Sequence, residues 1–381
     1  MNRTFERARA VLSRVNLGQL AVPLLAIFTA MLISSLIILI SGADPLRAFA
    51  ALTEGAIGSQ VAIVETLIKA TPFLLVGLGI AVAFRGGLFN IGVEGQLFVG
   101  SAVAVIIGYS IQLPAIIHLP LVLLGGMLGG ALWAGIAGIL KARFGAHEVI
   151  TTIMLNYIAL RIINWAIGSD VPMRAPLTSV PETSAVFESA RLPILLADSR
   201  LHAGVLIALA MIFVVYWLLW RTTLGFEIRM VGANPSAARY AGIKVELNIV
   251  LTMLISGALA GLAGGIQVIG LSPFNFTTGF NVGLGFDSIA VAVLGAISPF
   301  GIALAALLFG AMDAGARLMQ LRTRVPADII TVTQGLILAF VAADQIIRGL
   351  YRIKAKGPVA EGKIHLSETW GGNRGGRSAG D

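Results

Sequence analysis

The sequence contains no cysteine and few charged residues. Without cysteine, its 381 residues can form no disulfide and offer no thiolate for catalysis or metal binding. Charged residues make up only 12%, about half the share usual in soluble domains. Apolar residues make up 57% and recur in runs of about 20, the length that crosses a hydrocarbon layer. These features predict an all-α polytopic membrane protein with about ten transmembrane helices.

Catalytic motifs are also missing. No Walker A sequence, GxxxxGK[ST], is present. His147-Glu148 begins like the zinc motif HExxH, but Thr151 stands where the second histidine is needed. We therefore expect no catalytic residue, no metal ligand and no bound cofactor on this chain. Energy for any transport would have to come from another chain or from an ion gradient.

Basic residues are concentrated at the two ends of the chain and in short connecting loops. The net charge of +8 is therefore arranged as the positive-inside rule requires, which argues against nucleic acid as a partner. The pattern predicts a basic cytoplasmic arm over residues 1–19 and a transmembrane domain over 20–347. A basic, glycine-rich cytoplasmic tail, disordered beyond about Pro358, is expected over 348–381. Both termini are expected in the cytoplasm.

Ten apolar segments are expected to enter the membrane. The eighth is too short to cross alone and is expected to be a half-helix. Residues 43–60 and 169–200 are expected as outer connections. The segments cover residues 20–42, 61–84, 88–111, 119–140, 149–168, 202–220, 249–271, 286–296, 301–317 and 327–347.

Polar side chains occur within these segments. The stretch Phe84–Gly100 combines five glycines with Arg85, Asn90, Glu94 and Gln96. Ionisable groups at membrane depth are costly and are functional candidates by default. The alternative is a cytoplasmic turn with a satisfied carboxylate. Glu65 and Lys69, four residues apart, are either an ion pair inside the membrane or a pair in its outer interface.

A short internal repeat accompanies this stretch. Phe89-Asn90-Ile91-Gly92 recurs 191 residues later as Phe280-Asn281-Val282-Gly283. On the expected topology the two copies lie near opposite faces of the membrane. This is the pattern of an inverted repeat, in which transporters place their substrate path between the two halves.

Residues 221–248 form the longest polar segment inside the transmembrane domain. Asn234-Pro235 is typical of a helix start, with asparagine as N-cap and proline in the first turn. A short surface helix over Ser236–Ile243, closed by Gly242, is expected. Its residues Ala238, Arg239 and Tyr240 are candidates for docking a partner. The alternative is an ordinary turn between two spans.

Four motifs carry a family resemblance that covers about residues 20–347. They are FRGGLFNIGVEGQLFVGS, HEVITTIMLNYIA, VGANPSAARYAGI and GFDSIAVAVLGAISPFGIALAALLFGA. The chain resembles permease subunits of ABC importers for branched-chain amino acids, simple sugars and nucleosides, and within these the nucleoside or general simple-sugar branch. The resemblance implies a fold like that of the vitamin B12 importer, with ten helices and an inverted repeat. It also implies the bacterial plasma (inner) membrane as the location.

The resemblance also implies partners. These are a second, homologous permease subunit in a heterodimer, an ATPase subunit that binds ATP-Mg, and an external substrate-binding lipoprotein or periplasmic protein. The segment Gly232–Ile243 corresponds to the coupling helix of the family. Contact with the ATPase is therefore expected from Gly232, Asn234, Pro235, Ala238, Arg239, Tyr240 and Gly242.

The function expected from the sequence is ATP-driven import of a nucleoside or related small polar solute. Amides and a carboxylate can satisfy sugar hydroxyls and base edges, and aromatic rings can stack on a base. Hydrogen bonding between helices is the structural alternative for each of these positions. An ion-coupled secondary transporter that uses Glu94 is the alternative function. The expected pathway residues are Asn90, Glu94, Gln96, Asn156, Tyr157, Asn164, Phe274 and Phe276.

Overall fold

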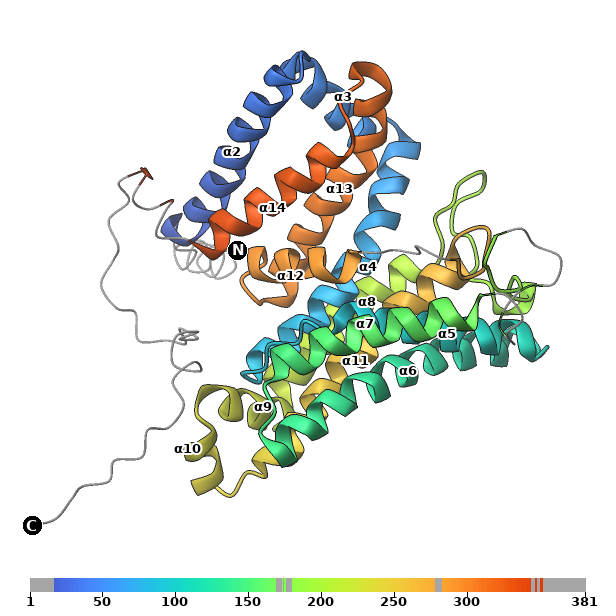
Figure 1. The fold of residues 1–381 in the computed structure, drawn as a ribbon, viewed down its shortest axis with the longest axis vertical. Coiled ribbons are helices and arrows are strands. Elements are labelled where there is room, and N and C mark those ends of the chain that lie inside the picture. The colour runs from blue at the N-terminus through green and yellow to red at the C-terminus, as the bar shows by residue number, and fades with distance from the viewer. Residues whose placement is uncertain are drawn as a thin grey trace, which may run out of the picture.

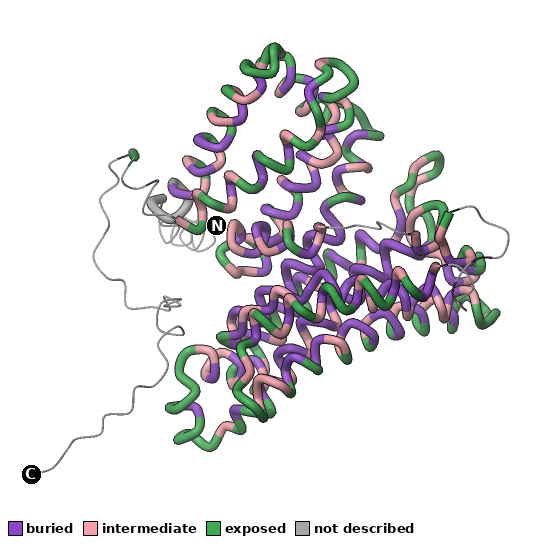
Figure 2. The backbone as a smooth tube through the Cα atoms, viewed as in Figure 1, coloured by how far each residue is buried: buried purple, intermediate pink, exposed green. Residues whose placement is uncertain are grey.

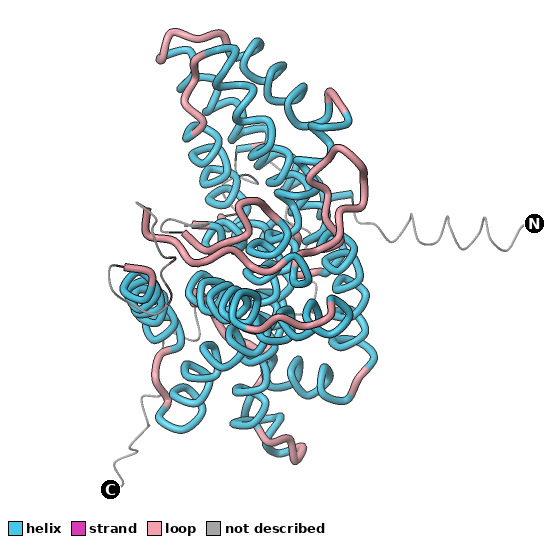
Figure 3. The backbone as a smooth tube through the Cα atoms, turned by 90° about the vertical axis from the view of Figure 1, so that its right-hand side faces the viewer, coloured by secondary structure: helices cyan, strands magenta, loops and turns pink. Residues whose placement is uncertain are grey.

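The computed structural model describes residues 17–168, 173, 175, 180–277, 283–343, 347, 350 and 351. Within these residues the regular elements are helices, and the extended segments form two isolated β-bridges, Glu182 with Thr277 and Ile194 with His202. The second view of the molecule shows helices joined by loops (Figure 3). The predicted all-α fold is confirmed over this part of the chain.

The helices follow one another along the chain with short connections. In order they are α2 (Leu17–Ile40), α3 (Pro45–Ile57), α4 (Gln60–Arg85), α5 (Val93–Ser110), α6 (Ala115–Phe144), α7 (Glu148–Ala166), the 3₁₀ turn η1 (Glu188–Ala190), α8 (Gly204–Arg221), α9 (Thr223–Ala233), α10 (Pro235–Tyr240), α11 (Val245–Gly270), α12 (Leu284–Leu294), α13 (Pro299–Thr323) and α14 (Asp328–Ala342).

Each of the ten predicted spans contains one of these helices. Among the described residues, eight helices are long and apolar enough to cross a membrane, and α12 and α14 are shorter apolar helices. The half-helix expected after residue 286 is α12, with 11 residues. The last span was expected to reach residue 347, but α14 ends at Ala342, and residues 344–346 lie outside the described part. The N-terminal arm and the tail beyond Tyr351 also lie outside it, apart from Leu17, Gly18 and Gln19 at the start of α2.

Helix α3 corrects the expectation for residues 43–60. Helix α2 ends at Ile40, and the Asp44-Pro45 pair starts the next helix: Asp44 is the N-cap, and its side chain accepts a hydrogen bond from the backbone N–H of Leu46 at 2.9 Å. Proline fits the first turn because the N–H that it lacks has no intrahelical partner there. The outer connection is therefore largely helical.

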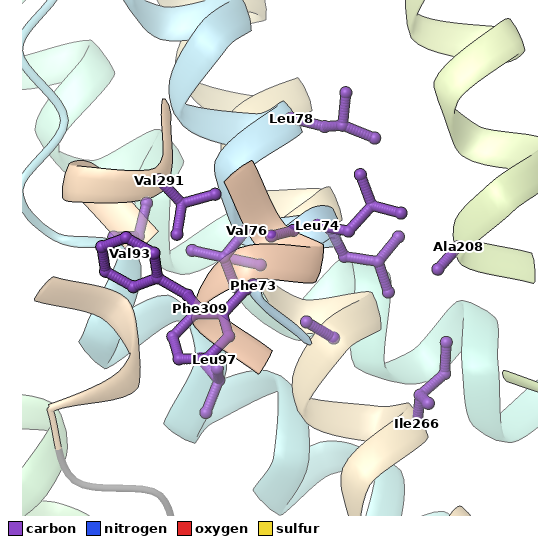
Figure 4. Close-up of a cluster of buried hydrophobic side chains, with 14 of the residues drawn as sticks. Phe73, Leu74, Val76, Leu78, Val93, Leu97, Ala208, Ile266, Val291 and Phe309 are labelled. Atoms are coloured by element: carbon purple, nitrogen blue, oxygen red, sulfur yellow. The ribbon is translucent and has the colours of Figure 1, made fainter. Parts of the chain in front are cut away.

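Helix α4 occupies the centre of the molecule. It packs against α8, α11, α12 and α13, and its residues from Ala70 to Phe84 are all buried. In Figure 1 it runs between two groups of helices, α2, α3, α13 and α14 on one side and α5, α6, α7 and α11 on the other. Figure 4 shows the apolar side chains gathered around it, among them Phe73, whose ring meets that of Phe309 edge to face at 6.0 Å.

Helices α6 and α11 are held together by glycines. A Cβ atom added at Gly130 would lie 2.3 Å from the carbonyl oxygen of Gly257 and 2.7 Å from the Cα of Gly261. The two backbones therefore touch directly, which is how small residues let helices pack in lipid without a hydrophobic driving force. Helices α6 and α7 also carry exposed apolar residues, among them Leu128, Leu132 and Ile150, and exposed positions recur along both helices in Figure 2.

Candidate functional site

The Phe84–Gly100 stretch contains the end of α4, the turn that follows it and the first part of α5. Helix α4 ends at Arg85, and Gly87 adopts a left-handed conformation with φ of 71°. The chain then passes through residues 88–92 to the start of α5. Asn90, Glu94 and Gln96 all lie within or just after this turn and are all buried. The turn and its carboxylate therefore form one buried unit.

Asn90 is the centre of a closed network of amides. Its Nδ2 donates to the side-chain oxygen of Gln96 at 3.0 Å and to the hydroxyl of Ser256 at 2.9 Å. Its Oδ1 accepts from Nε2 of Gln96 at 2.9 Å and from the backbone N–H of Gly92 at 3.1 Å. These bonds join α5 to α11, and they use the donors and acceptors that a solute would need.

Asn156 makes a similar connection from α7. Its Oδ1 accepts from the backbone N–H of Gly95 at 2.8 Å, and its Nδ2 donates to the carbonyl of Ile91 at 2.9 Å. The N-cap residue of α5 is Gly92, which has no side chain, so the first amides of this helix need partners from elsewhere. The side chain of Asn156, on α7, supplies an acceptor for one of these amides, that of Gly95.

Glu94 faces the start of α12. Its two carboxylate oxygens accept from the backbone N–H groups of Gly283 at 2.6 Å and Gly285 at 2.5 Å. Only 4% of Glu94 is exposed. Hydrogen bonds to a charged group contribute about 1.5–3 kcal/mol each, which offsets the cost of burying the carboxylate. Both oxygens of the Glu94 carboxylate therefore have partners, while its role in a solute pathway stays a prediction.

The other candidate pathway residues are separated from this unit. Tyr157 is 62% exposed, whereas Asn164 is half-buried near the end of α7. The guanidinium carbon of Arg191 lies 4.4 Å from the ring centre of Phe274. Phe276 is buried, with its ring edge to face with Phe98 at 6.4 Å. The structure thus brings together Asn90, Glu94, Gln96 and Asn156, and leaves Tyr157 on an outer surface.

Some contributing residues were missed at the level of sequence. Ser256 completes the Asn90 network, and its only signal was a hydroxyl in an apolar run of small residues. Glu65 does not pair with Lys69 but with Arg200, 135 residues away, through two hydrogen bonds of 2.9 and 2.7 Å. The local i,i+4 spacing was the wrong guide, because a planar guanidinium binds both carboxylate oxygens and an ammonium does not.

The polar segment between α8 and α11 folds into two short helices, α9 and α10. Asn234 is the N-cap of α10, as predicted, and its side chain accepts from the backbone N–H of Ala237 at 3.0 Å. Pro235 is the first residue of α10. The helix is shorter than expected, ending at Tyr240, and Gly242 turns the chain with a φ of 83°.

Some side chains of α10 are buried in this chain, whereas others are exposed on its surface. Ala238 is buried against Val231 and Val245, so it anchors α10 to this chain. Arg239 is paired with Glu246 of the same chain at 2.5 Å. Tyr240 is 95% exposed and is the large side chain available to a partner.

Helix α9 touches the turn after α4. A Cβ added at Gly232 would lie 2.1 Å from the carbonyl oxygen of Arg85 and 2.7 Å from the backbone nitrogen of Gly87. The close approach is possible because both Gly87 and Gly232 lack a side chain. The segment that carries α10 is therefore in direct backbone contact with the turn at Arg85–Gly87, which leads to Asn90.

A bundle of apolar helices of membrane-spanning length, with buried polar networks between them, is the architecture of a multi-pass membrane protein. Residues 62–342 match the family described as branched-chain amino acid transport system / permease component. The chain belongs to this family of ABC transporter permease components, as the sequence motifs predicted. Members of this kind are not themselves enzymes.

Similar proteins include two bacterial nucleoside permeases. The guanosine ABC transporter permease protein NupP of Bacillus subtilis is 43% identical over 342 residues, covering 90% of this chain and 98% of NupP. The nucleoside ABC transporter permease protein NupB of Lactococcus lactis is 37% identical, covering 86% of this chain and 91% of NupB. The glucose ABC transporter permease protein of Haloferax volcanii is 32% identical, covering 87% and 89%. An ion-coupled carrier that uses Glu94 is not favoured by these relatives.

Proposed function

We propose that this chain is the permease subunit of an ATP-driven importer that moves a nucleoside, or a related small polar solute such as a simple sugar, across the bacterial plasma membrane. The observation that carries the proposal is the similarity over almost the whole chain to permeases named for guanosine and other nucleosides. The glucose permease among the relatives is the reason for including simple sugars.

In this proposal three partners complete the transporter. A second, homologous permease pairs with this chain as a heterodimer, and an external binding lipoprotein or periplasmic protein delivers the solute. An ATPase subunit, which holds ATP-Mg, docks on α9 and α10, while this chain itself binds no cofactor. The exposed Tyr240 and the capped start of α10 support docking at this segment. The α10 end then faces the cytoplasm, as do both termini.

The solute pathway belongs to the proposal as well. Tyr157 and Asn164 of α7 are the polar candidates that are exposed or half-buried and lie outside the buried polar unit, so they are the first we assign to the pathway. Contact of the solute with Asn90, Glu94, Gln96, Asn156, Phe274 or Phe276 stays a prediction. For the three amides it would require the network around Asn90 and Asn156 to open.

Uptake by the assembled transporter tests the function. Cells that lack other nucleoside carriers and express the four components should accumulate radiolabelled guanosine or another nucleoside. Uptake should continue when an uncoupler dissipates the ion gradients and stop when the ATPase carries an inactivating Walker A substitution, which serves as the matched control. Uptake abolished by the uncoupler at unchanged ATP would contradict the proposal, as would transport of neither nucleosides nor sugars.

A further inference from the structure

Helix α12 lies between the two helix groups. It packs against α4 and α5 on one side and against α13 and α14 on the other (Figure 1). It is short, and both of its ends are irregular: Gly283 precedes it with a φ of 94°, and Ala296 and Ile297 follow it with φ of 52° and 54°. A helix of 11 residues with such ends needs contacts from its neighbours to keep its position.

The carboxylate of Glu94 provides the contact at the start of α12. The backbone N–H groups that it binds, those of Gly283 and Gly285, belong to the end of a helix that carries partial positive charge. Glu94 also lies in the first turn of its own helix, α5. One buried carboxylate therefore lies between the N-termini of two helices, a position where negative charge is favoured twice.

The contact joins equivalent positions of the internal repeat. With the spacing of 191 residues between the two Phe-Asn-x-Gly copies, the residue that corresponds to Glu94 is Gly285. A Cβ at Gly285 would lie 2.6 Å from the Cα of Glu94. Only one of the two equivalent positions can therefore carry a side chain, and the carboxylate of one copy binds the backbone of the other.

Arg85 provides the contact at the other end of α12. Its Nη2 and Nε donate to the carbonyl of Ile297 at 3.2 and 3.4 Å, three residues beyond Leu294, the last residue of α12. The guanidinium also lies 5.4 Å from the ring centre of Trp220. The carbonyl of Arg85 itself is in the turn that α9 touches through Gly232.

We propose that Glu94 and Arg85 are positioning residues for transport, which hold the two ends of α12 so that movement of α9 and α10 is transmitted to this half-helix. The path consists of direct contacts. Helix α9 touches the turn at Arg85–Gly87, and the connection between α4 and α5 reaches α12 through the side chains of Arg85 and Glu94. The inference rests on the proposed function, because an ATPase bound at α10 is what would move this end of the molecule.

Distance measurements on α12 test the inference. Because this chain has no cysteine, Phe286→Cys on α12 and Leu132→Cys on α6 can take nitroxide labels at two exposed positions, in an assembly whose other subunits carry no cysteine. The same pair is measured in the presence of Glu94→Gln, which leaves one oxygen and sets an NH₂ group against a backbone N–H. Glu148→Gln is the matched control, because Glu148 is a buried carboxylate that pairs with Lys141 at 2.7 Å.

Glu94→Gln is expected to broaden the distribution of label distances and to lower uptake per ATP hydrolysed by about tenfold, the factor that loss of one charged hydrogen bond produces in an equilibrium. Glu148→Gln should change neither. Arg85→Gln, which leaves Glu94 in place, is the second variant if Glu94→Gln fails to assemble, and should act in the same direction.

Unchanged label distances in Glu94→Gln and Arg85→Gln would overturn the inference. So would altered distances with a normal ratio of uptake to ATP hydrolysis, since the two residues would then be structural only. These outcomes differ from failure of the proposed function, in which the wild-type transporter itself shows no uptake of nucleosides or sugars, while the label distances can still be measured.

Discussion

At the scale of single residues, the buried polar side chains bind one another and the backbone. Asn90, Gln96 and Ser256 form one network, and Asn156 caps the start of α5 from another helix. In the bilayer core there is no water to bond with a polar group, so these amides and this hydroxyl bind partners within the fold. Asn90, Gln96 and Asn156 therefore hold neighbouring helices together, whether or not they also meet a solute.

Replacing Asn156 tests this role. Asn156→Ala leaves the N–H of Gly95 and the carbonyl of Ile91 without their side-chain partner, and an unsatisfied buried group costs about 1–3 kcal/mol. We expect a lower unfolding temperature of the purified chain in detergent. Tyr157→Phe, at the exposed neighbouring position, should leave the unfolding temperature unchanged. Equal stability of the two variants would show that the Asn156 bonds are not formed.

His202, in the loop before α8, gives a pH dependence. Burial, together with the charge of Arg200, lowers the pKa of His202 from 6.5 to about 4, and its Nδ1 accepts the N–H of Gly204 at 3.2 Å. Because the unfolded chain binds this proton at higher pH, the contribution to stability is complete above pH 6.5. It is lost as the pH falls toward 4, by about 3 kcal/mol at about 1.4 kcal/mol per pH unit.

Unfolding midpoints measured from pH 7 to pH 4 check this sign. The stability of His202→Gln should fall less between pH 7 and pH 4 than that of the wild type. His147→Gln, which removes an exposed histidine, should show the same fall as the wild type. If the wild type and His202→Gln lose stability in parallel, His202 is not buried in its neutral form.

At the scale of elements, close contact between glycines decides how α6 meets α11. The apolar run predicts that both are membrane helices, but it does not say which faces touch. The contact is marked by glycines at which an added Cβ would meet backbone atoms and not a flexible side chain, as at Gly130. The shape of this interface is therefore sensitive to single methyl groups at some glycines and tolerant at others of the same helix.

Two alanine substitutions in α6 should separate these cases. Gly130→Ala sets a methyl group 2.3 Å from a backbone oxygen and should destabilise the chain by about 1–3 kcal/mol, the usual cost of overpacking. Gly135→Ala meets only the end of the Leu254 side chain, at 2.9 Å, which can rotate away. Unfolding temperature and membrane yield measure both. Equal losses would mean that the helices are not in backbone contact at Gly130.

At the scale of the whole molecule, the surface segment with α10 is joined by backbone contact to the interior. Gly232 of α9 touches the turn at Arg85–Gly87, and the buried unit around Asn90 begins directly after this turn. The surface segment and the start of the buried unit are therefore neighbours in space, which is the contact that the proposed coupling to an ATPase would use.

Tyr240→Asp tests docking at α10. A charge in place of the exposed ring should reduce co-purification of the ATPase subunit and uncouple ATP hydrolysis from uptake, while the chain stays inserted in the membrane. Leu321→Asp is the matched control, since Leu321 is also exposed but lies near the end of α13, a part of the chain distant in sequence from α10. Arg239→Asp should act in the same direction, but it also breaks the pair with Glu246. Undiminished ATPase binding by Tyr240→Asp would contradict docking at this helix.

The sequence by itself determined the features that depend on neighbouring residues. The length of each apolar run predicted the ten membrane segments, the Asn234-Pro235 pair predicted where α10 begins, and four motifs predicted the family. These signals are local, because helix length and capping are set within a few residues of each site. The same local reasoning missed α3, because residues 43–60 were expected only as a connection, although Asp44-Pro45 is a typical helix start.

The tertiary structure alone decided which polar groups meet. Glu94 binds the backbone of Gly283 and Gly285, Glu65 pairs with Arg200, and Asn156 caps a helix that begins 63 positions earlier at Val93. Such partners are more than 60 residues apart, and nothing in their own sequence neighbourhood identifies them. The partners of the Glu94 carboxylate therefore depend on where α12 lies, and only the packing of the whole chain sets that position.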